Sequence, residues 1–498
     1  MEAVSGLANG FAQVLTGTNL YYCFIGSLVG TLIGVLPGIG PLAAMSLLLP
    51  ATAALTPVAA MSMLAALFYG AMYGGSTTSI LVRIPGEAAS VVTCLDGYEM
   101  AKRGRAGAAL GMAALGSFIA GTLSLVLLTF FSPMLSEVAL SFGPPENAAL
   151  MLLGLVCTIL LIEGSALKGL IMIGFGAFLA SIGMDNVTGT ERFTLGTVNL
   201  TGGIDLLALV IGLFGISEIL ANVETQIRAQ VVKAKIGSLL PSLDEWRRSA
   251  VPIVRGSGLG FILGLIPGGG PVTAAFMSYA VEKRLSRHPE RFGKGEIAGV
   301  AGPESANNSA VAAGMIPLMS LGLPGNAVTA LLMGALVIQG VQPGPMFIVQ
   351  KPEVFWGVVA SMYMGNVFLL ILNLPLIGLW VQLLRVPYHV LFPLILLFSI
   401  VGAYSANKNV FDLWVMLGLG VLGYVLRKLR YELAPLVLAF VLAPMLEQAI
   451  RQSMVMSPEG AAIFVTRPLS LGLLGLVAAL VGYVLFSRRR IQFQGGEI

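Results

Sequence analysis

Two short polar runs interrupt apolar stretches, and their side chains are the first candidates for chemistry. The run GGSTTS (74–79) brings four consecutive hydroxyl groups, and the run PESANNS (303–309) brings a carboxyl group and two consecutive amides. A single Ser or Thr in an apolar bundle usually bonds to a neighbouring helix. Consecutive polar residues point around a helix, so neighbouring helices cannot serve all of them. We therefore predict that these runs contact a substrate or ion through Ser76, Thr77, Thr78, Asn307, Asn308 and Ser309.

Glu304 is the strongest candidate for coupling to an ion, because a carboxyl group at membrane depth is costly and this one closely precedes the asparagine pair. Asn308 and Thr78 are further candidates for contact with that ion, since both offer oxygen atoms. No certain metal site is expected, because the two histidines, His288 and His389, are far apart in the sequence.

Other charged residues near helix breaks admit two interpretations. Glu87, Glu146 and Glu163 are either functional groups at membrane depth or loop residues at the interface. Arg83 could pair with a substrate carboxylate or extend to the membrane surface. A structural role is expected for the remaining candidates: Glu218 and Glu447 near helix ends, and Asp96 and Glu99 paired in a loop with Lys102 and Arg103.

Pro-Gly clusters supply a second kind of candidate site, made of backbone. They are GVLPGIGP (34–41), RIPGE (83–87), GLIPGGGP (264–271) and GLPGN (322–326). A helix that begins after such a break presents unpaired N–H groups and about half a positive charge, which suits a carboxylate. Opposing helix ends that present carbonyl groups suit a cation. The glycines expected to line this site are Gly38, Gly40, Gly268, Gly269, Gly270 and Gly325.

The composition requires that these residues lie in a membrane. Of 498 residues 56% are hydrophobic and 10% are charged, and the mean hydropathy is +0.90. Soluble proteins carry about 25% charged residues. The fold class is therefore an all-α polytopic membrane protein. Nucleic-acid binding is not expected, because the net charge is only +4 and the basic residues cluster in loops.

The two halves of the chain resemble each other. LIGVLPGIGPLAA (32–44) matches ILGLIPGGGPVTA (262–274), and IPGEAAS (84–90) matches LPGNAVT (323–329), in the same order. We predict two repeats, with an extra helix at the C-terminus. The expected parts are an N-terminal segment (1–19), repeat one (20–221), a basic linker (222–255), repeat two (256–450), and a transmembrane helix with a basic tail (451–498).

Loop charges predict that the repeats have opposite orientations. The stretch 283–296 is rich in Lys and Arg, whereas its repeat-one counterpart 51–62 has no charge; 102–105 is basic, whereas 330–350 has neither Lys nor Arg. Short basic loops stay cytoplasmic, so we expect the linker and the C-terminus to be cytoplasmic too. The segment 256–282 must then enter and leave on one side. We predict a re-entrant hairpin with about a dozen residues per arm and PGGGP at its tip, an inverted twin around PGIGP, and a meeting of the two tips.

At these motifs the chain resembles the TctA family, the large membrane subunit of tripartite tricarboxylate transporters. The resembling stretches include GVLPGIGP (34–41), YGGSTTSILVRIPGEAASVV (73–92), FGPPEN (142–147) and the long block from Gly264 to Leu336. The sequence departs from the family at Arg83, where an uncharged polar residue is common, and at Glu99, where Pro is common. Arg83 lies close to the predicted site, so this departure puts the family's usual tricarboxylate substrate in doubt for this chain.

The resemblance implies a secondary transporter of the bacterial inner membrane, without a cofactor, that takes up citrate-like or other small carboxylate anions. It implies a Na⁺ or H⁺ gradient as the driving force. It also implies a small TctB-type membrane subunit and a periplasmic TctC-type solute-binding protein as partners. Two alternatives are a channel, because inverted re-entrant hairpins occur there too, and an intramembrane enzyme, for which the sequence offers no HExxH, GxSxG or paired aspartates within helices.

Overall fold

The computed structural model describes residues 2–494 except 37–39, 140, 161–164, 186, 226–237, 267–268, 384–387 and 459. The described chain is almost wholly helical, with one two-stranded antiparallel ribbon in which Gly183 lies opposite Arg192. Six described helices are long and apolar enough to cross a membrane, and a bent pair near the C-terminus makes a possible seventh. The predicted all-α polytopic membrane fold is therefore confirmed at this level.

The elements of the first half share a pattern of long apolar helices separated by short breaks. They are α1 (Glu2–Val14), α2 (Gly17–Val35), α3 (Pro41–Thr52), α4 (Pro57–Val82), the 3₁₀ turn η1 (Ala88–Val91), α5 (Thr93–Lys102), α6 (Ala106–Ala139), α7 (Pro144–Leu160), α8 (Ala166–Ala180), β1 (Gly183–Met184), β2 (Glu191–Arg192), η2 (Val198–Leu200), α9 (Leu206–Val210), the π-helical segment η3 (Ile211–Ile216) and α10 (Ser217–Thr225).

The second half has a similar order of elements. They are α11 (Leu243–Leu265), α12 (Pro271–Leu285), η4 (Pro289–Arg291), α13 (Ala298–Leu321), α14 (Ala327–Ile338), α15 (Phe347–Gln350), α16 (Pro352–Asn373), α17 (Ile377–Leu383), α18 (Tyr388–Asn407), α19 (Val410–Lys428), α20 (Ala434–Met456), η5 (Gly460–Ala462), α21 (Ile463–Thr466) and α22 (Pro468–Gln494).

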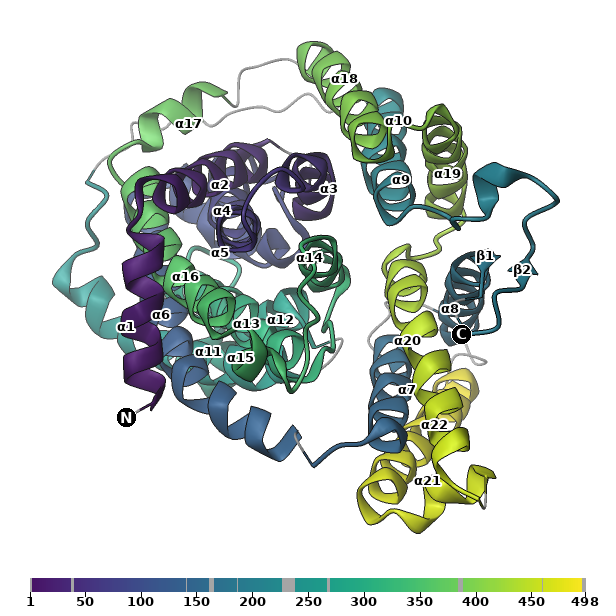
Figure 1. Ribbon diagram of the computed structural model, residues 1–498. Helices are drawn as coiled ribbons and strands as arrows, with labels where there is room; N and C mark the ends of the chain where they lie inside the picture. The colour runs from purple at the N-terminus through teal and green to yellow at the C-terminus, as the bar shows by residue number, and fades with distance from the viewer. Residues whose placement is uncertain are drawn as a thin grey trace.

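The helices α4 and α13 form the centre of an inner bundle. Every residue of α4 from Val58 to Val82 is buried, and so is every residue of α13 from Gly299 to Ser320. The helix α4 packs on α2 and α16, while α13 packs on α11 and α6. The inner bundle consists of α1–α6 and α11–α16. In Figure 1 an outer group stands apart from it, with α7, α8, α20 and α22 on one flank and with α9, α10, α18 and α19 on the side of α3.

Two stripes of glycine let the helices of the inner bundle approach closely. In α2 the stripe is Gly26, Gly30 and Gly34, and α11 has glycines 230 residues further on, at Gly256, Gly260 and Gly264. A Cβ atom on Gly30 would lie 2.3 Å from the Leu67 carbonyl oxygen, and one on Gly260 would lie 2.2 Å from that of Ala306. Since lipid provides no hydrophobic drive between helices, such close packing holds membrane helices together.

The chain breaks where the Pro-Gly clusters predict. In both halves one helix ends before the cluster, at Val35 or Leu265, and the next begins at its final proline, Pro41 or Pro271. The predicted arm of about a dozen residues is wrong for α11, which has 23 residues. A capping box at Ser242 starts this helix early, so it includes residues 243–255 of the predicted linker.

Asp96 contradicts the expectation of ordinary loop pairing. Glu99 does pair with Lys102 at 2.9 Å, but Asp96 is fully buried and accepts hydrogen bonds from the backbone N–H groups of Gly293, Gly295 and Glu296. The Tyr279 hydroxyl donates a fourth bond, 2.9 Å long. Asp96 therefore fastens the first half of the chain to a loop of the second, a role that depends on contacts distant in sequence.

An ion cluster joins the ribbon of β1 and β2 to α20. Its ribbon members, Asp185 and Arg192, lie outside the candidate spans, whereas Glu447 and Arg451 belong to α20. Arg192 and Arg451 both contact Asp185 and Glu447. The Val187 backbone N–H, the Thr188 hydroxyl and the two guanidinium groups hold the pKa of Asp185 well below its usual range. Glu447 thus has the structural role expected of it.

We expect Gly260→Val to destabilise the protein and Gly258→Val to leave it nearly unchanged. Both glycines are in α11, but a Cβ at Gly258 meets nothing within 4 Å. Overpacking of this kind costs about 1–3 kcal/mol. Melting temperatures of the two purified variants measure the difference. Equal melting temperatures would show that the glycine stripe does not support the bundle.

Candidate functional site

Residues that follow both Pro-Gly breaks line one cavity. Its volume is about 530 Å³, and both Pro41 and Pro271 line it. The inner bundle supplies the start of α3, the loop before η1, and the starts of α12 and α14. The outer helices supply Phe214, Glu218 and Arg427, and Ala434 at the start of α20. The cavity therefore lies between the two groups of helices and receives residues from both halves of the sequence.

A second cavity, of about 440 Å³, adjoins the first. The two share Ala88, Pro271, Val272, Asn326, Ala327, Glu432 and Ala434. Gly270 and Gly325 line the second cavity. Gly270 has a φ of 34°, which favours glycine at the start of α12. We call the two cavities together the tip cavity.

Within the described part of the chain, five helix beginnings line the tip cavity, those of α3, η1, α12, α14 and α20, and side chains cap two of them. The Glu87 carboxylate accepts from Ala89 N–H at 2.6 Å to cap η1, and Asn326 accepts from Thr329 N–H at 2.9 Å to cap α14. The N-cap positions of α3 and α12 are Gly40 and Gly270, which have no side chain to offer. The first N–H groups of these two helices remain available to an anion.

Charged side chains in the tip cavity are mostly acidic. Its lining contains Glu87, Glu218 and Glu432 but a single guanidinium, that of Arg427. Arg427 forms an ion pair with Glu218. This pairing agrees with the structural role expected for Glu218, although its position at the cavity was not foreseen. An anion that enters this cavity meets backbone dipoles and carboxylates, with little cationic side-chain charge.

Glu304 lies behind the tip cavity in a buried polar network. Its carboxylate accepts hydrogen bonds from the hydroxyl groups of Ser76, at 2.6 Å, and Thr93. The Asn308 amide donates to Ser117 Oγ at 2.7 Å and to the Glu304 carbonyl at 3.1 Å. The network thus brings together the two polar runs, which are more than 220 residues apart in sequence.

The asparagine pair has oxygen atoms without protein partners. Asn307 donates to the Glu87 carboxylate at 3.5 Å, so it links the network to the lining of the tip cavity. Within the described part of the chain, no donor reaches Oδ1 of Asn307 or of Asn308. Buried oxygens of this kind are acceptors for a water molecule or for a small cation.

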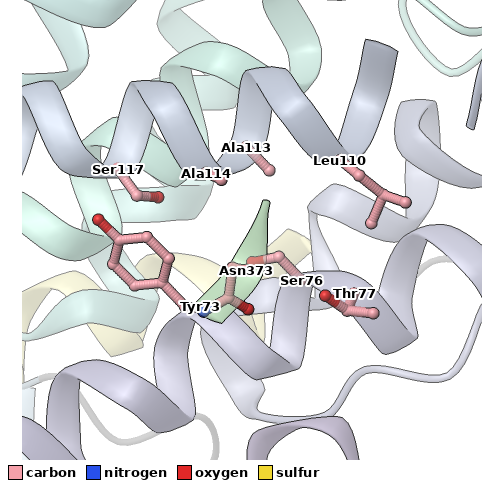
Figure 2. A pocket seen from close by; sticks show the side chains of 8 residues that line it. All are labelled: Tyr73, Ser76, Thr77, Leu110, Ala113, Ala114, Ser117 and Asn373. Carbon is pink, nitrogen blue, oxygen red and sulfur yellow. The ribbon is translucent and has the colours of Figure 1, made fainter. Parts of the chain in front are cut away.

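A small enclosed space adjoins Ser76 and Thr77. Figure 2 shows these residues on α4 facing Ala113, Ala114 and Ser117 of α6, with Asn373 of α16 beside them. The space measures about 10 Å³, which suits one water molecule. It is too small for a carboxylate substrate, and neither Ser76 nor Thr77 lines the tip cavity in this conformation.

The predicted site residues therefore fall into four groups. Gly40, Gly270 and Gly325 line the tip cavity. Ser76, Thr77, Glu304, Asn307 and Asn308 belong to the network and the small space behind it. Gly38 and Gly268 lie outside the described residues, as does Glu163. The remaining three, Thr78, Ser309 and Gly269, have hydrogen bonds within the fold.

These last three residues have structural bonds that the sequence did not indicate. Thr78 donates to the Val35 carbonyl at 2.8 Å, at the end of α2. Ser309 donates to the Ser257 carbonyl at 2.6 Å, and Gly269 N–H donates to Ile266 at 2.9 Å. In this conformation they support the break and the bundle and do not face the tip cavity.

Two charged candidates also lie away from the tip cavity. Arg83 is exposed, and its guanidinium lies 5.6 Å from the centroid of the Tyr98 ring. Glu146 is buried and pairs with Arg467 at 2.6 Å, which joins α7 to the start of α22.

Sequence reasoning missed Thr93, Ser117 and Asn326. Asn326 had a usable signal, because it follows a Pro-Gly pair as Glu87 does and both residues form a capping box. Thr93 and Ser117 are single hydroxyl residues in helices, for which interhelical bonding is the ordinary expectation.

We expect a cysteine at Ala88 to react with a methanethiosulfonate reagent and a cysteine at Ala89 to resist it. Ala88 lines both parts of the tip cavity, whereas Ala89 is buried against Val92 and Ala275. The background should lack the three native cysteines, which are all buried. Equal labelling rates would mean that the tip cavity is closed to small solutes.

Comparison with known proteins agrees with this architecture. The sequence model of the tripartite tricarboxylate transporter TctA family matches residues 20–438. The chain is 50% identical to an uncharacterized 52.8 kDa protein in the TAR-I ttuC' 3' region of Agrobacterium vitis, over 97% of this chain and 96% of that protein. It is 53% identical to an uncharacterized protein in the TAR-II ttuC' 3' region of the same organism, over 44% of this chain and 90% of that one. No solved structure matches the chain.

The family match covers most of the chain, and the first of these relatives aligns along nearly its full length. The helices long enough to span a membrane agree with a multi-pass membrane protein. The chain therefore belongs to the TctA family and is a tricarboxylate transporter subunit.

Proposed function

We propose that this subunit translocates a tricarboxylate or another small carboxylate anion by secondary active transport, driven by a Na⁺ or H⁺ gradient. A periplasmic TctC-type binding protein delivers the substrate, and a small TctB-type membrane subunit completes the assembly in the bacterial inner membrane. The observation that carries this proposal is the tip cavity, on which the uncapped N-termini of α3 and α12 converge. Its larger part has a volume typical of small-molecule sites, about 300–1,000 Å³.

The acidic lining of the tip cavity supports coupling to a cation. Backbone N–H groups at the helix starts attract a carboxylate. Glu87 opposes it when ionised, because like charges at short range in a low-dielectric site repel each other. A proton or a sodium ion bound with the substrate offsets this repulsion. Glu304 and the free amide oxygens of Asn307 and Asn308 are the groups that we assign to that ion.

Packing within the bundle supports two repeats of opposite orientation. The pair α2 and α4 has its counterpart in α11 and α13, and the pair α4 and α16 in α13 and α6. The basic loops meet, since Arg105 pairs with Glu245 at 2.6 Å and Asp96 binds residues 293–296. Their neutral counterparts also meet, because Gln339 donates to the Thr52 carbonyl at 2.6 Å. This arrangement is expected if the basic loops share the cytoplasmic face.

The position of the tip cavity supports alternating access. The inner bundle carries both breaks and the polar network, and the outer helices supply the facing wall. Movement of the inner bundle against the outer group exposes the substrate to one side and then to the other. The proposal treats the outer helices as a scaffold.

Reconstituted transport is the direct test. Proteoliposomes that contain this chain and its small subunit should accumulate a radiolabelled carboxylate only with the binding protein outside and an imposed Na⁺ or H⁺ gradient. Accumulation without any gradient would contradict secondary transport. Flux that does not saturate with substrate would indicate a channel.

We expect Gly40→Asp to lower uptake about tenfold or more, because a new carboxylate at the start of α3 repels the substrate. Gly40 suits this test because a Cβ there meets nothing within 4 Å, whereas one on Gly269 would lie 2.1 Å from the Leu263 carbonyl oxygen. Gly40→Ala is the matched control and should transport normally. Normal uptake by Gly40→Asp would remove the α3 terminus from the substrate site.

We expect Glu304→Gln to lower uphill uptake about tenfold or more while exchange of labelled substrate across the membrane continues. The amide keeps an acceptor for Ser76 or Thr93 but cannot carry the charge that exchanges with the ion. Glu353→Gln, at an exposed position of α16, is the control. Unchanged uphill uptake by Glu304→Gln would exclude Glu304 from coupling.

A further inference from the structure

A third cavity lies away from the tip cavity, at the opposite ends of α11 and α12. Its volume is about 710 Å³, and it is lined by the N-terminal part of α11, the end of α12 and the loop that leads to α13. Five arginines line it: Arg247, Arg248, Arg255, Arg287 and Arg291. We call it the basic cavity.

Only two of the five arginines are neutralised by the lining. Arg255 pairs with Glu282 at 3.1 Å, and Arg248 pairs with Glu296. Within the described part of the chain, no carboxylate lies within 4.0 Å of Arg247, Arg287 or Arg291. With His288 neutral, five arginines and two glutamates leave this cavity a net charge of +3. This excess of positive charge attracts anions to the cavity.

The rim of the basic cavity is apolar and exposed. Val251 and Leu285 line the cavity, and each is 59% exposed. Val254, one helical position before Arg255, is also exposed. A soluble anion gains nothing from such a rim. A molecule with an anionic head and hydrocarbon chains satisfies both parts of the site, because its chains cover the apolar side chains.

Guanidinium groups favour phosphate because their planar N–H donors match its oxygens in pairs. We propose that the basic cavity binds the phosphate headgroup of an anionic phospholipid, with the acyl chains lying along Val251, Val254 and Leu285. The position fits this ligand, since α11 runs from a polar, capped start into an apolar segment in a chain that spans the membrane. The bound lipid would contact the start of α11 and the end of α12. The other end of α12 lines the tip cavity.

Lipid retention by the full-length protein tests the proposal. The wild-type protein, Arg287→Gln/Arg291→Gln and Lys283→Gln/Arg284→Gln are placed in nanodiscs of phosphatidylcholine and phosphatidylglycerol. They are then returned to detergent at high salt, and the retained lipids are measured by native mass spectrometry. The second double variant is a matched control, because it loses the same charge from exposed α12 residues that do not line the cavity. High salt screens general attraction to the lipid surface.

We expect the wild type and the control to retain phosphatidylglycerol in preference to phosphatidylcholine. The variant at the cavity should retain about 30-fold less, since each basic residue near an anionic headgroup contributes a factor of about five. Equal retention by all three proteins would overturn the proposal.

A second measurement separates a lipid from a soluble phosphate compound. Melting temperatures in detergent should rise with added phosphatidylglycerol and remain unchanged with millimolar inorganic phosphate. A rise with inorganic phosphate that disappears in Arg287→Gln/Arg291→Gln would assign the cavity to a soluble phosphate and overturn the lipid.

Discussion

Broken backbone inside a membrane must be covered by protein, because hydrocarbon offers no partner for a free N–H or C=O group. The two breaks of this chain meet the constraint through α4 and α13, which are buried along nearly their whole length. Glycine stripes in α2 and α11 bring backbone against backbone, so that the helices before the breaks rest directly on these two. Thr78 also donates to the last carbonyl groups of α2, so it supplies a hydrogen-bond partner for backbone exposed at the break. The site therefore depends on helix packing before it depends on any charged group.

The tip cavity combines attraction and repulsion for an anion. Helix starts at Pro41 and Pro271 offer positive backbone dipoles, whereas Glu87 brings negative charge when it is ionised. Under the proposed function, this site binds its anion more strongly when a cation is bound as well. The proposed symport requires such thermodynamic coupling. The buried network from Glu304 to Asn307 lies directly behind this lining, where a bound ion would influence it.

Corresponding elements of the two halves pack against each other, although they are far apart in sequence. Each half supplies one break, one buried polar helix and one capped turn, and the two sets interlock at the centre of the bundle. Contacts such as Ser76 with Glu304 and Asp96 with residues 293–296 join the halves. Each half needs a long helix of the other half to bury its polar helix. The helix α4 packs on α16, and α13 packs on α6.

The sequence by itself determined the helical membrane class, the positions of both breaks, and the residues of the polar runs. These features depend on local composition and on Pro and Gly, whose effects act within a few residues. The glycine stripes were equally visible, although only the structure identified their partner helices. The tertiary structure decided which hydroxyl groups serve the fold, as Thr78 and Ser309 do, and which surround Glu304. It also placed Asp96 at the junction of the halves and Arg427 with Glu218 in the tip cavity. These outcomes depend on which distant helices become neighbours, and the packing of the whole bundle sets that arrangement.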